Sequence, residues 1–438
     1  MDTQNFDLRH HWMPFTANRA FQQDPRLITK AEGVYYWDQR GNQIFDASSG
    51  LFTTSAGHKR EEIIDAVYRQ LNEVDYVPHF NLGHPSSFEL SKLITDIAPA
   101  GFSHVFFANS GSEAIDSSIK MIHAYWRSKN EAQRQIFVSR ARAYHGVNLG
   151  GTSLGGMLNN KRVFPGLPGV LHMRHTLHEK NRFRWGEGEE GGLDFADDLE
   201  RIAEVYGGEN IAACYVEPVS GSIGSYVPPK NYLKRLREIC DRYQILLVFD
   251  EVITGFGKTG EPFAAQTFDV NPDVITIAKS LTNGVIPMGG VLVKDELYRT
   301  VAEQAKENAI ELFHGYTYSA HPVACAAGIA TQKIYIQEKL FERVSQLAPH
   351  FEKAMLSLRS CDLVTDIRGI GLMGAFDLAP LDNTPGKRGR VFCKRLFEHG
   401  VHIKFTGDTP VLALPFIVNE EQIAELFHVI REQLELLC

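Results

Sequence analysis

Residues 244–251 read QILLVFDE, an apolar run that ends in two carboxylates. A short, continuous apolar run indicates a strand buried on both faces, as the strands of a parallel sheet are. Similar runs recur along the middle of the chain, and helical patterns lie between them, for instance over residues 112–126. This alternation predicts an α/β domain with a mainly parallel sheet. The other predicted strands are HVFFAN (104–109), QIFVS (135–139), IAACYVEP (211–218), VITIAK (274–279) and MGGVLV (288–293).

The chain has 438 residues, more than one hydrophobic core usually supports, so two domains are expected. After about residue 322 the pattern changes to a long helical stretch, followed by short strands and a final amphipathic helix. We therefore expect a large domain over residues 56–321 and a smaller α+β domain over residues 322–438. Residues 1–55 contain the short strand patterns GVYYWD and QIFDAS, and we expect them to join the smaller domain.

The composition is that of an ordinary globular protein, with 53 acidic and 45 basic residues, a formal net charge of −8 and 44% hydrophobic residues. The mild negative charge argues against a nucleic-acid partner. No apolar stretch is long enough to span a bilayer, and the start, MDTQNFDLRHHWMP, has no signal-peptide pattern, so no membrane partner is expected. The cysteines are scattered without a CxxC pair, and no Cys/His spacing indicates a metal, so we expect a cytoplasmic protein without disulfides or metal. The six cysteines are Cys214, Cys240, Cys325, Cys361, Cys393 and Cys438.

Three short patterns resemble known signatures but lack the required context. The glycines of RGIGLMGAF (368–376) have the spacing of a dinucleotide-binding loop, but no helix-forming run follows, so we predict a turn between two strands. The GKT at 257–259 lacks the first glycine of a phosphate-binding loop. The GTSLG at 151–155 matches a nucleophile elbow around Ser153, but a poor helix start follows it, so we expect a glycine-rich loop.

Two segments that follow predicted strands fit the binding of a flat, phosphorylated ligand. SGSE (110–113) lies directly before a helix, where backbone N–H groups bind anions and a glycine lets a phosphate approach. Its S-x-x-E spacing also fits a capping box, so the segment predicts either a phosphate site or a helix cap. YHG (144–146) offers an aromatic ring that either stacks on a ligand or lies exposed in a loop.

Asp250 and Lys279 each end a predicted buried strand, and burying either charge is costly without a partner. One interpretation is a structural ion pair between the two. The other is that Asp250 pairs with a protonated pyridine nitrogen, while Lys279, whose pKa burial lowers, forms a Schiff base with a carbonyl group. Together with the phosphate segment and the aromatic ring, the second interpretation fits pyridoxal phosphate.

Several ordered motifs resemble the class III aminotransferases, the ω-aminotransferase branch of the fold-type-I pyridoxal-phosphate enzymes. HHWMPFTANR near the start and HGYTYSAHPVACAAG (314–328) are similar to the β-alanine (ω-amino acid):pyruvate aminotransferases. The resemblance runs from about residue 10 to the C-terminus. The motifs that carry it are SGSEA (110–114), YHG (144–146), EP (217–218), FDEVITGFGKTG (249–260) and IAKSLTNG (277–284).

The resemblance implies a role for each cofactor residue. Lys279 would bind pyridoxal 5'-phosphate covalently and move the reaction's proton, and Asp250 would keep the pyridine nitrogen protonated. Thr317 would reach the phosphate of a neighbouring subunit, which implies a homodimer or homotetramer with shared active sites. The other cofactor-binding residues implied are Ser110, Gly111 and Ser112 at the phosphate, Tyr144 and Val252 on the two faces of the ring, and His145 and Glu217 beside it.

Three substrate positions depart from the β-alanine enzymes. Phe52 stands at a tryptophan position, Lys404 at the position of the carboxylate-binding arginine, and Val411 at a glutamine position. Each change makes the mouth of the site more apolar, so we expect longer ω-amino acids or hydrophobic amines to be preferred over β-alanine.

The sequence thus predicts a transaminase that moves the amino group of an ω-amino acid or amine to pyruvate in two half-reactions, giving alanine and an aldehyde or ketone. An aminomutase of the same fold is an alternative, and it would form no net alanine. A serine hydrolase that uses Ser153 is a second alternative.

Overall fold

The computed structural model of the protein describes residues 7–437; the first six residues of the quoted N-terminal stretch and Cys438 lie outside that range. The middle of the chain forms a seven-stranded sheet of order β4-β11-β10-β9-β8-β5-β6. β11 is antiparallel to both of its neighbours, and the other pairs are parallel, so the predicted mainly parallel sheet is confirmed. The strands are β4 (Phe102–Ala108), β5 (Ile136–Arg140), β6 (Val170–Met173), β8 (Ile211–Val216), β9 (Leu246–Asp250), β10 (Val274–Ile277) and β11 (Gly289–Lys294).

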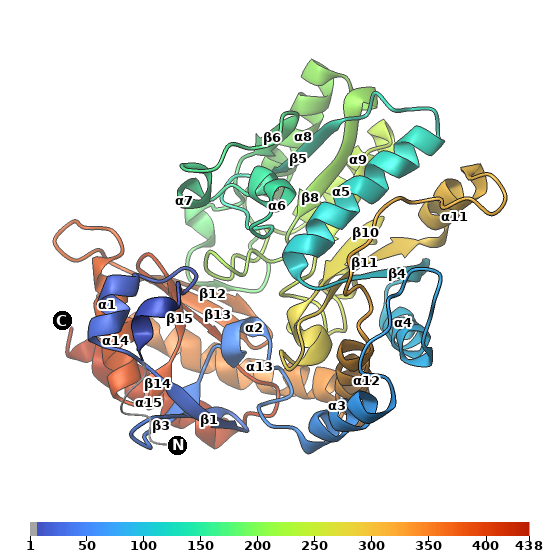
Figure 1. Cartoon of the computed structure of the whole chain (residues 1–438). Helices are drawn as coiled ribbons and strands as arrows, with labels where there is room; N and C mark the ends of the chain where they lie inside the picture. Colours follow the sequence, from blue (N-terminus) through green and yellow to red (C-terminus); the bar gives the residue numbers. More distant parts are fainter. Residues whose placement is uncertain (1–6, 438) are drawn as a thin grey trace.

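Two smaller sheets, of order β1-β2-β3-β14 and β15-β16-β13-β12-β7, join distant parts of the chain. β14 pairs in parallel with β3, so the N-terminal strands share a sheet with a C-terminal one, as the blue and red ribbons show in Figure 1. β7 comes from the middle of the chain and pairs with β12. These strands are β1 (Ile28–Glu32), β2 (Tyr35–Asp38), β3 (Gln43–Asp46), β7 (Arg184–Trp185), β12 (Val364–Ile370), β13 (Met373–Leu378), β14 (Val401–His402), β15 (Lys404–Thr406) and β16 (Thr409–Ala413).

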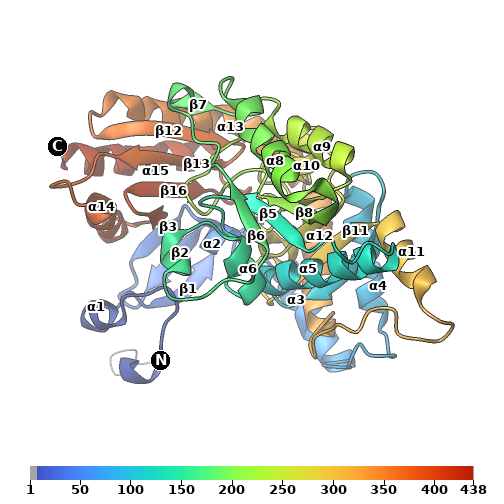
Figure 2. The ribbon, with the colours of Figure 1, turned by 90° about the horizontal axis from the view of Figure 1, so that it is seen from above.

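Helices cover both faces of the seven-stranded sheet and pack beside the five-stranded one (Figures 1 and 2). The long helices are α3 (Glu61–Glu73), α4 (Pro85–Ile97), α5 (Gly111–Ser128), α8 (Gly192–Tyr206), α9 (Tyr232–Tyr243), α11 (Asp295–Gln304), α12 (Pro322–Gln337), α13 (Leu340–Ser357), α14 (Lys387–Glu398) and α15 (Glu420–Glu435). Short helices are α1 (Asn18–Gln23), α2 (Ser49–Phe52), α6 (Leu149–Leu154), α7 (Leu158–Lys161) and α10 (Ala264–Thr267). None of the helices within residues 7–437 is both long and apolar enough to cross a membrane.

Alternate residues of the central strands face opposite helix layers. Along β8, Ala213 and Tyr215 join the buried cluster that includes α5, whereas Cys214 and Val216 join the cluster that includes α8 and α9. Figure 2 shows α5 on one side of the sheet and α8 and α9 on the other. Because both faces are buried, these strands have continuous apolar sequences rather than alternating ones.

The RGIGLMGAF segment forms the end of β12 and the start of β13, which pair antiparallel. Gly371 lies between them with φ +58°, a left-handed conformation that favours glycine. The predicted turn between two strands is confirmed.

The GTSLG segment does not form the expected loop, because most of it belongs to α6. A Cβ on Gly151 would lie 2.2 Å from the carbonyl oxygen of His145, so this glycine allows the helix to pack directly against the YHG segment. Ser153 is buried in α6, and its Oγ accepts a hydrogen bond from the Leu167 N–H at 2.7 Å. Ser153 therefore does not sit on an exposed strand-to-helix elbow, and this contradicts the hydrolase alternative.

Candidate active site

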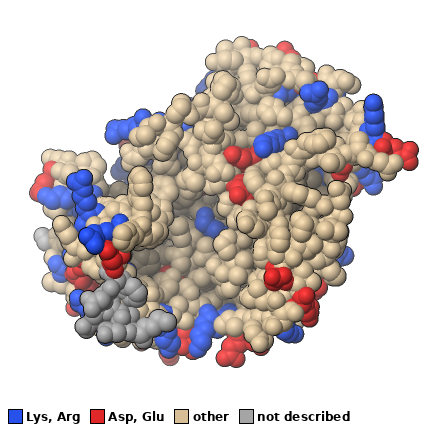
Figure 3. Space-filling model, in the orientation of Figure 1, with Lys and Arg blue, Asp and Glu red and all other residues tan. Residues whose placement is uncertain are grey.

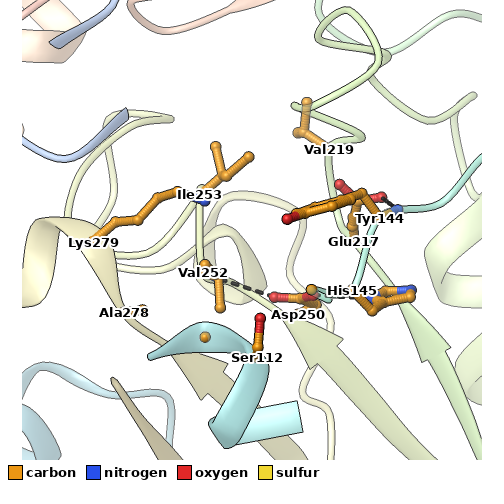
Figure 4. A pocket seen from close by; sticks show the side chains of 12 residues that line it. Ser112, Tyr144, His145, Glu217, Val219, Asp250, Val252, Ile253, Ala278 and Lys279 are labelled. Atoms are coloured by element: carbon orange, nitrogen blue, oxygen red, sulfur yellow. Dashed lines mark hydrogen bonds and ion pairs between the residues drawn. The ribbon is translucent and has the colours of Figure 1, made fainter. Parts of the chain in front are cut away.

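A pocket opens at the carboxyl ends of the parallel strands, where open α/β sheets bind their ligands. Figure 3 shows a hollow on this face, between the part of the molecule that contains the seven-stranded sheet and the part that contains the two smaller sheets. Figure 4 shows the pocket from close by. The segments that follow β4, β5, β8, β9 and β10 all contribute to it. The lining residues are Gly111, Ser112, Tyr144, His145, Gly146, Glu217, Val219, Asp250, Val252, Ile253, Ala278 and Lys279.

The first turn of α5 forms one end of the pocket. The Oγ of Ser110 accepts a hydrogen bond from the Glu113 N–H at 3.1 Å, so Ser110 caps the helix. A Cβ on Gly111 would lie 2.9 Å from Val252 Cγ1, so only glycine lets the backbone lie this close. The N–H groups of a helix N-terminus attract anions, and Gly111 and Ser112 present this end of α5 to the pocket. Ser110 itself does not line the pocket, because its hydroxyl is used in the cap.

Asp250 extends from the end of β9 into the pocket and forms an ion pair with His145 rather than with Lys279. Its Oδ2 lies 2.7 Å from His145 Nδ1, and the His145 Nε2 lies 3.1 Å from Ser139 Oγ. The Oδ1 of Asp250 accepts hydrogen bonds from the Val252 N–H and the Thr276 hydroxyl, each at 3.1 Å. The carboxylate is thus held rigidly, and the alternative of a structural ion pair between Asp250 and Lys279 is not observed.

Tyr144 and Val252 lie on different sides of the pocket, and Glu217 lies beside Tyr144 (Figure 4). The Tyr144 N–H donates to Glu217 Oε1 at 3.0 Å, which fixes the aromatic residue at the pocket edge. Burial raises the pKa of Glu217, and the nearby Asp250 raises it further. Burial, with the charges of Asp250 and Glu217, also raises the pKa of the Tyr144 hydroxyl.

Lys279 follows β10, and its side chain extends across the pocket from the side opposite Tyr144 (Figure 4). Its Nζ has no hydrogen bond or ion pair with any residue in the described range and lies 5.9 Å from the centre of the Phe52 ring. Burial lowers the pKa of the Lys279 amine, and Asp250 and Glu217 oppose this shift. A half-buried amine with a lowered pKa and no hydrogen-bond or ion-pair partner among the described residues is available as a nucleophile.

The three predicted substrate residues lie in different surroundings. Phe52 is buried, and the Nζ atoms of Lys279 and Lys404 each lie 5.9 Å from its ring centre. The Lys404 Nζ donates to the Ser222 carbonyl oxygen and to Thr406 Oγ1. Both residues thus lie next to the pocket without lining it.

Val411 is fully buried in β16, where it pairs with Ala375 of β13. Its side chain belongs to the hydrophobic core and does not line the pocket. This position contradicts the expectation that Val411 makes the mouth of the site more apolar. The sequence pattern could not show it, because the side chain's direction depends on the register of β16 against β13.

Thr317 lies exposed in the segment between α11 and α12, outside the pocket lining of its own chain. Its carbonyl oxygen accepts a hydrogen bond from the Tyr76 hydroxyl at 2.9 Å.

Four lining residues were not predicted: Gly146, Val219, Ile253 and Ala278. Three of them directly adjoin predicted residues in the chain, so their position near a strand end could have indicated that they line the pocket. Val219 follows β8 after two intervening residues, and no pattern distinguishes it.

Comparison with known proteins agrees with this geometry. Residues 16–434 match the family described as aminotransferase class-III. The chain is 47% identical to the β-alanine–pyruvate aminotransferase of Pseudomonas aeruginosa over 99% of this chain and 97% of that protein. It is 48% identical to the ω-amino acid–pyruvate aminotransferase of Pseudomonas putida over 97% of this chain and 95% of that protein. The crystal structure of the ω-transaminase of Pseudomonas jessenii in complex with PMP superposes with a TM-score of 0.93 at 33% identity, covering 98% of this chain and 96% of that one.

The fold and the pocket are those of a fold-type-I aminotransferase that uses pyridoxal phosphate. The chain belongs to the class III aminotransferase family. The pocket residues fit this cofactor, because an anion-attracting helix end, a rigid carboxylate and an unpaired lysine surround one cavity.

Proposed function

We propose that the protein transfers the amino group of an ω-amino acid or amine to pyruvate, giving alanine and an aldehyde or ketone. The observation that carries the proposal is the unpaired Lys279 amine facing a pocket whose far wall holds the rigid Asp250–His145 pair. The pyruvate aminotransferases with which the chain shares nearly half of its residues support pyruvate as the acceptor.

Lys279 and Asp250 carry the main chemical roles in this proposal. When bound, pyridoxal phosphate supplies an electron sink that lets a proton leave the carbon bearing the amino group. The Lys279 amine would hold the cofactor and move that proton, and its lowered pKa makes the neutral amine more accessible. Asp250 would accept a hydrogen bond from the protonated ring nitrogen, and His145 would keep its carboxylate in place.

The remaining contacts position the ligand. Gly111 and Ser112 at the N-terminus of α5 would bind the phosphate. Tyr144 and Val252 would contact the two faces of the ring, and Glu217 would hold Tyr144 in position.

We also propose a homodimer or homotetramer, located in the cytoplasm, in which Thr317 completes the phosphate site of a neighbouring subunit. The exposure of Thr317, away from the pocket of its own chain, supports this assignment. Mixed dimers of Thr317→Ala and Lys279→Ala subunits provide the test. One intact site should form in each mixed dimer, whereas no recovery of activity would contradict the shared site.

Phe52 and Lys404 are the proposed substrate residues. An ammonium next to an aromatic ring would bind a donor with a remote carboxylate, but with a looser geometry than the two parallel hydrogen bonds of an arginine. We therefore propose longer ω-amino acids or hydrophobic amines as the preferred donors. A screen of donors against pyruvate, measured as alanine formed, tests this preference.

The experiment that tests the proposed function is reduction of the purified holoenzyme with borohydride. Reduction should attach the cofactor to Lys279, as found by peptide mapping, and the unreduced enzyme should form alanine from pyruvate. An adduct on another lysine would refute the assignment of Lys279. Turnover of an amino substrate without net alanine would favour the aminomutase alternative.

A further inference from the structure

The segment between β3 and the pocket, residues 47–53, has an unusual backbone. Ser49, Gly50 and Phe52 adopt φ values of 46°, 70° and 64°. Serine and phenylalanine rarely occupy this left-handed region, so the surrounding structure must hold the turn. We refer to residues 47–53 as the Phe52 turn; they include the short helix α2, in which Gly50 and Leu51 do not have helical backbone angles.

Asp46, at the end of β3, holds the Phe52 turn from within the core. Its carboxylate is fully buried and accepts hydrogen bonds from the Gly50 N–H at 2.5 Å and the Ser48 N–H at 3.2 Å. The His58 Nε2 lies 2.8 Å from the same carboxylate. Burial opposes ionisation of Asp46, but the hydrogen bond from His58 and the nearby His402 hold its pKa below the ordinary value. An ionised carboxylate is therefore available to accept both backbone N–H groups.

The Phe52 turn is tied to both lysines of the proposed site. On one side, Ser48 Oγ accepts a hydrogen bond from the Lys404 N–H at 2.7 Å. On the other side, the hydroxyl group of Ser280 donates a hydrogen bond to the Phe52 carbonyl oxygen at 3.3 Å, and Ser280 directly follows Lys279 in the chain. The Phe52 ring itself lies 5.9 Å from each ammonium. The turn thus sets the position of the ring and of Lys404 relative to Lys279.

We propose that Asp46 is a positioning residue for donor selection: by holding the Phe52 turn, it fixes Phe52 and Lys404 at the spacing that accepts a donor whose carboxylate is remote from its amine. Asp46 does not line the pocket, so it acts through these two residues and not on the reacting atoms. The inference rests on the proposed function, because it concerns which donors the transaminase accepts.

The test uses the Asp46→Asn variant. Asparagine has the same shape as aspartate, but its NH2 group cannot accept a hydrogen bond, so at least one of the N–H groups that now donate to Asp46 would lose its acceptor. We expect kcat/KM for a 6-carbon ω-amino acid to fall about tenfold relative to 1-phenylethylamine, with most of the change in KM. Hexanoate has a carboxylate but no amine, and its binding, measured by calorimetry, should weaken by a similar factor. Binding of the uncharged hexan-1-ol should change less.

The matched control is Asp38→Asn. Asp38 accepts hydrogen bonds from the backbone N–H groups of Arg40 and Asn42 at 2.8 and 2.9 Å, but it does so in the exposed turn between β2 and β3. This variant should leave the donor ratio and hexanoate binding unchanged. Ser48→Ala removes only the link to Lys404 and should shift the donor ratio in the same direction as Asp46→Asn, by about threefold.

Unchanged donor ratios and unchanged hexanoate binding in folded Asp46→Asn and Ser48→Ala would overturn the inference. If Asp46→Asn does not fold, the Ser48→Ala result alone decides. A wild-type enzyme that forms no alanine would instead refute the proposed function, and hexanoate binding would still decide whether Asp46 positions the site.

Discussion

The charge state of Lys404 should make recognition of acidic donors depend on pH. Burial lowers the pKa of Lys404 to about 8, Lys279 lowers it as well, and Glu217 opposes the shift. Its Nζ is bound by a carbonyl oxygen and a hydroxyl group, neither of which carries a charge that would keep the ammonium protonated. A donor carboxylate would therefore meet a full positive charge only below about pH 8.

The size of the effect follows from this pKa. About 90% of Lys404 is charged at pH 7 and about 10% at pH 9, so kcat/KM for a donor that needs this charge should fall roughly tenfold between the two. A donor without a carboxylate, such as 1-phenylethylamine, does not need it. The ratio of the two kcat/KM values removes the titrations that affect both donors, among them that of Lys279.

The control is Lys404→Arg, because arginine stays charged throughout this range. The ratio of an ω-amino acid to 1-phenylethylamine should fall about tenfold from pH 7 to pH 9 in the wild type and stay level in Lys404→Arg. The arginine should also raise the ratio for β-alanine at pH 7 by roughly tenfold if the gain is ~1.4 kcal/mol. Equal pH profiles in the two enzymes would refute the reasoning and show that position 404 does not bind the donor carboxylate.

Three further substitutions test the core and the cofactor site. Lys258→Met should stabilise the protein by up to ~5 kcal/mol at pH 7, because burial lowers the pKa of Lys258 to about 7 and its Nζ has no hydrogen-bond partner among the described residues. In the unfolded chain Lys258 stays protonated up to its ordinary pKa, so the gain in the free energy of unfolding should shrink as pH rises towards 10. Urea unfolding at several pH values measures this gain, and a gain that does not vary with pH would contradict the prediction. Asp250→Asn should raise the activation free energy that governs kcat/KM by ~3–5 kcal/mol without unfolding the protein, because an amide cannot hold the charge of the protonated ring nitrogen, and near-native rates would show that Asp250 does not partner that nitrogen. Gly111→Ala should weaken cofactor retention on gel filtration because its Cβ would lie 2.9 Å from Val252 Cγ1, and full retention would mean that Val252 moves aside.

The central sheet could be predicted from the sequence because burial on both faces leaves a clear pattern. β8 and the first four residues of β9 are continuously apolar, and each of these residues packs against one helix layer or the other. β6 and β7 were missed for the opposite reason. β6 is an edge strand with half-buried residues, and β7 has two residues whose pairing with β12 depends on a contact made more than 180 residues later in the chain.

Asp250, Lys279 and the SGSE and YHG segments could be singled out from the sequence because they lie at or just after strand ends, and parallel strands bring their carboxyl ends to one edge. Glu217 and Val252, which also line the pocket, were indicated only by the family resemblance. The partners of those residues could not be found in the same way. The ion pair between Asp250 and His145 depends on the path of the segment after β5, and the burial of Val411 depends on strand register. The left-handed conformations of Ser49 and Phe52 left no signal, because neither residue type favours them.

The charges around the pocket are held by the backbone and by neutral groups more than by one another. Lys279 has no ion-pair partner within the described residues, and Lys404 is bound by a carbonyl oxygen and a hydroxyl group. A purely structural set of buried charges would pair each ammonium with a carboxylate, because leaving one unpaired in the interior is costly. Asp250 is instead paired with His145, and Asp46 with His58, so neither carboxylate forms an ion pair with either lysine. The Lys279 amine therefore has no carboxylate to hold it in the charged form, and only the neutral amine can attack an aldehyde.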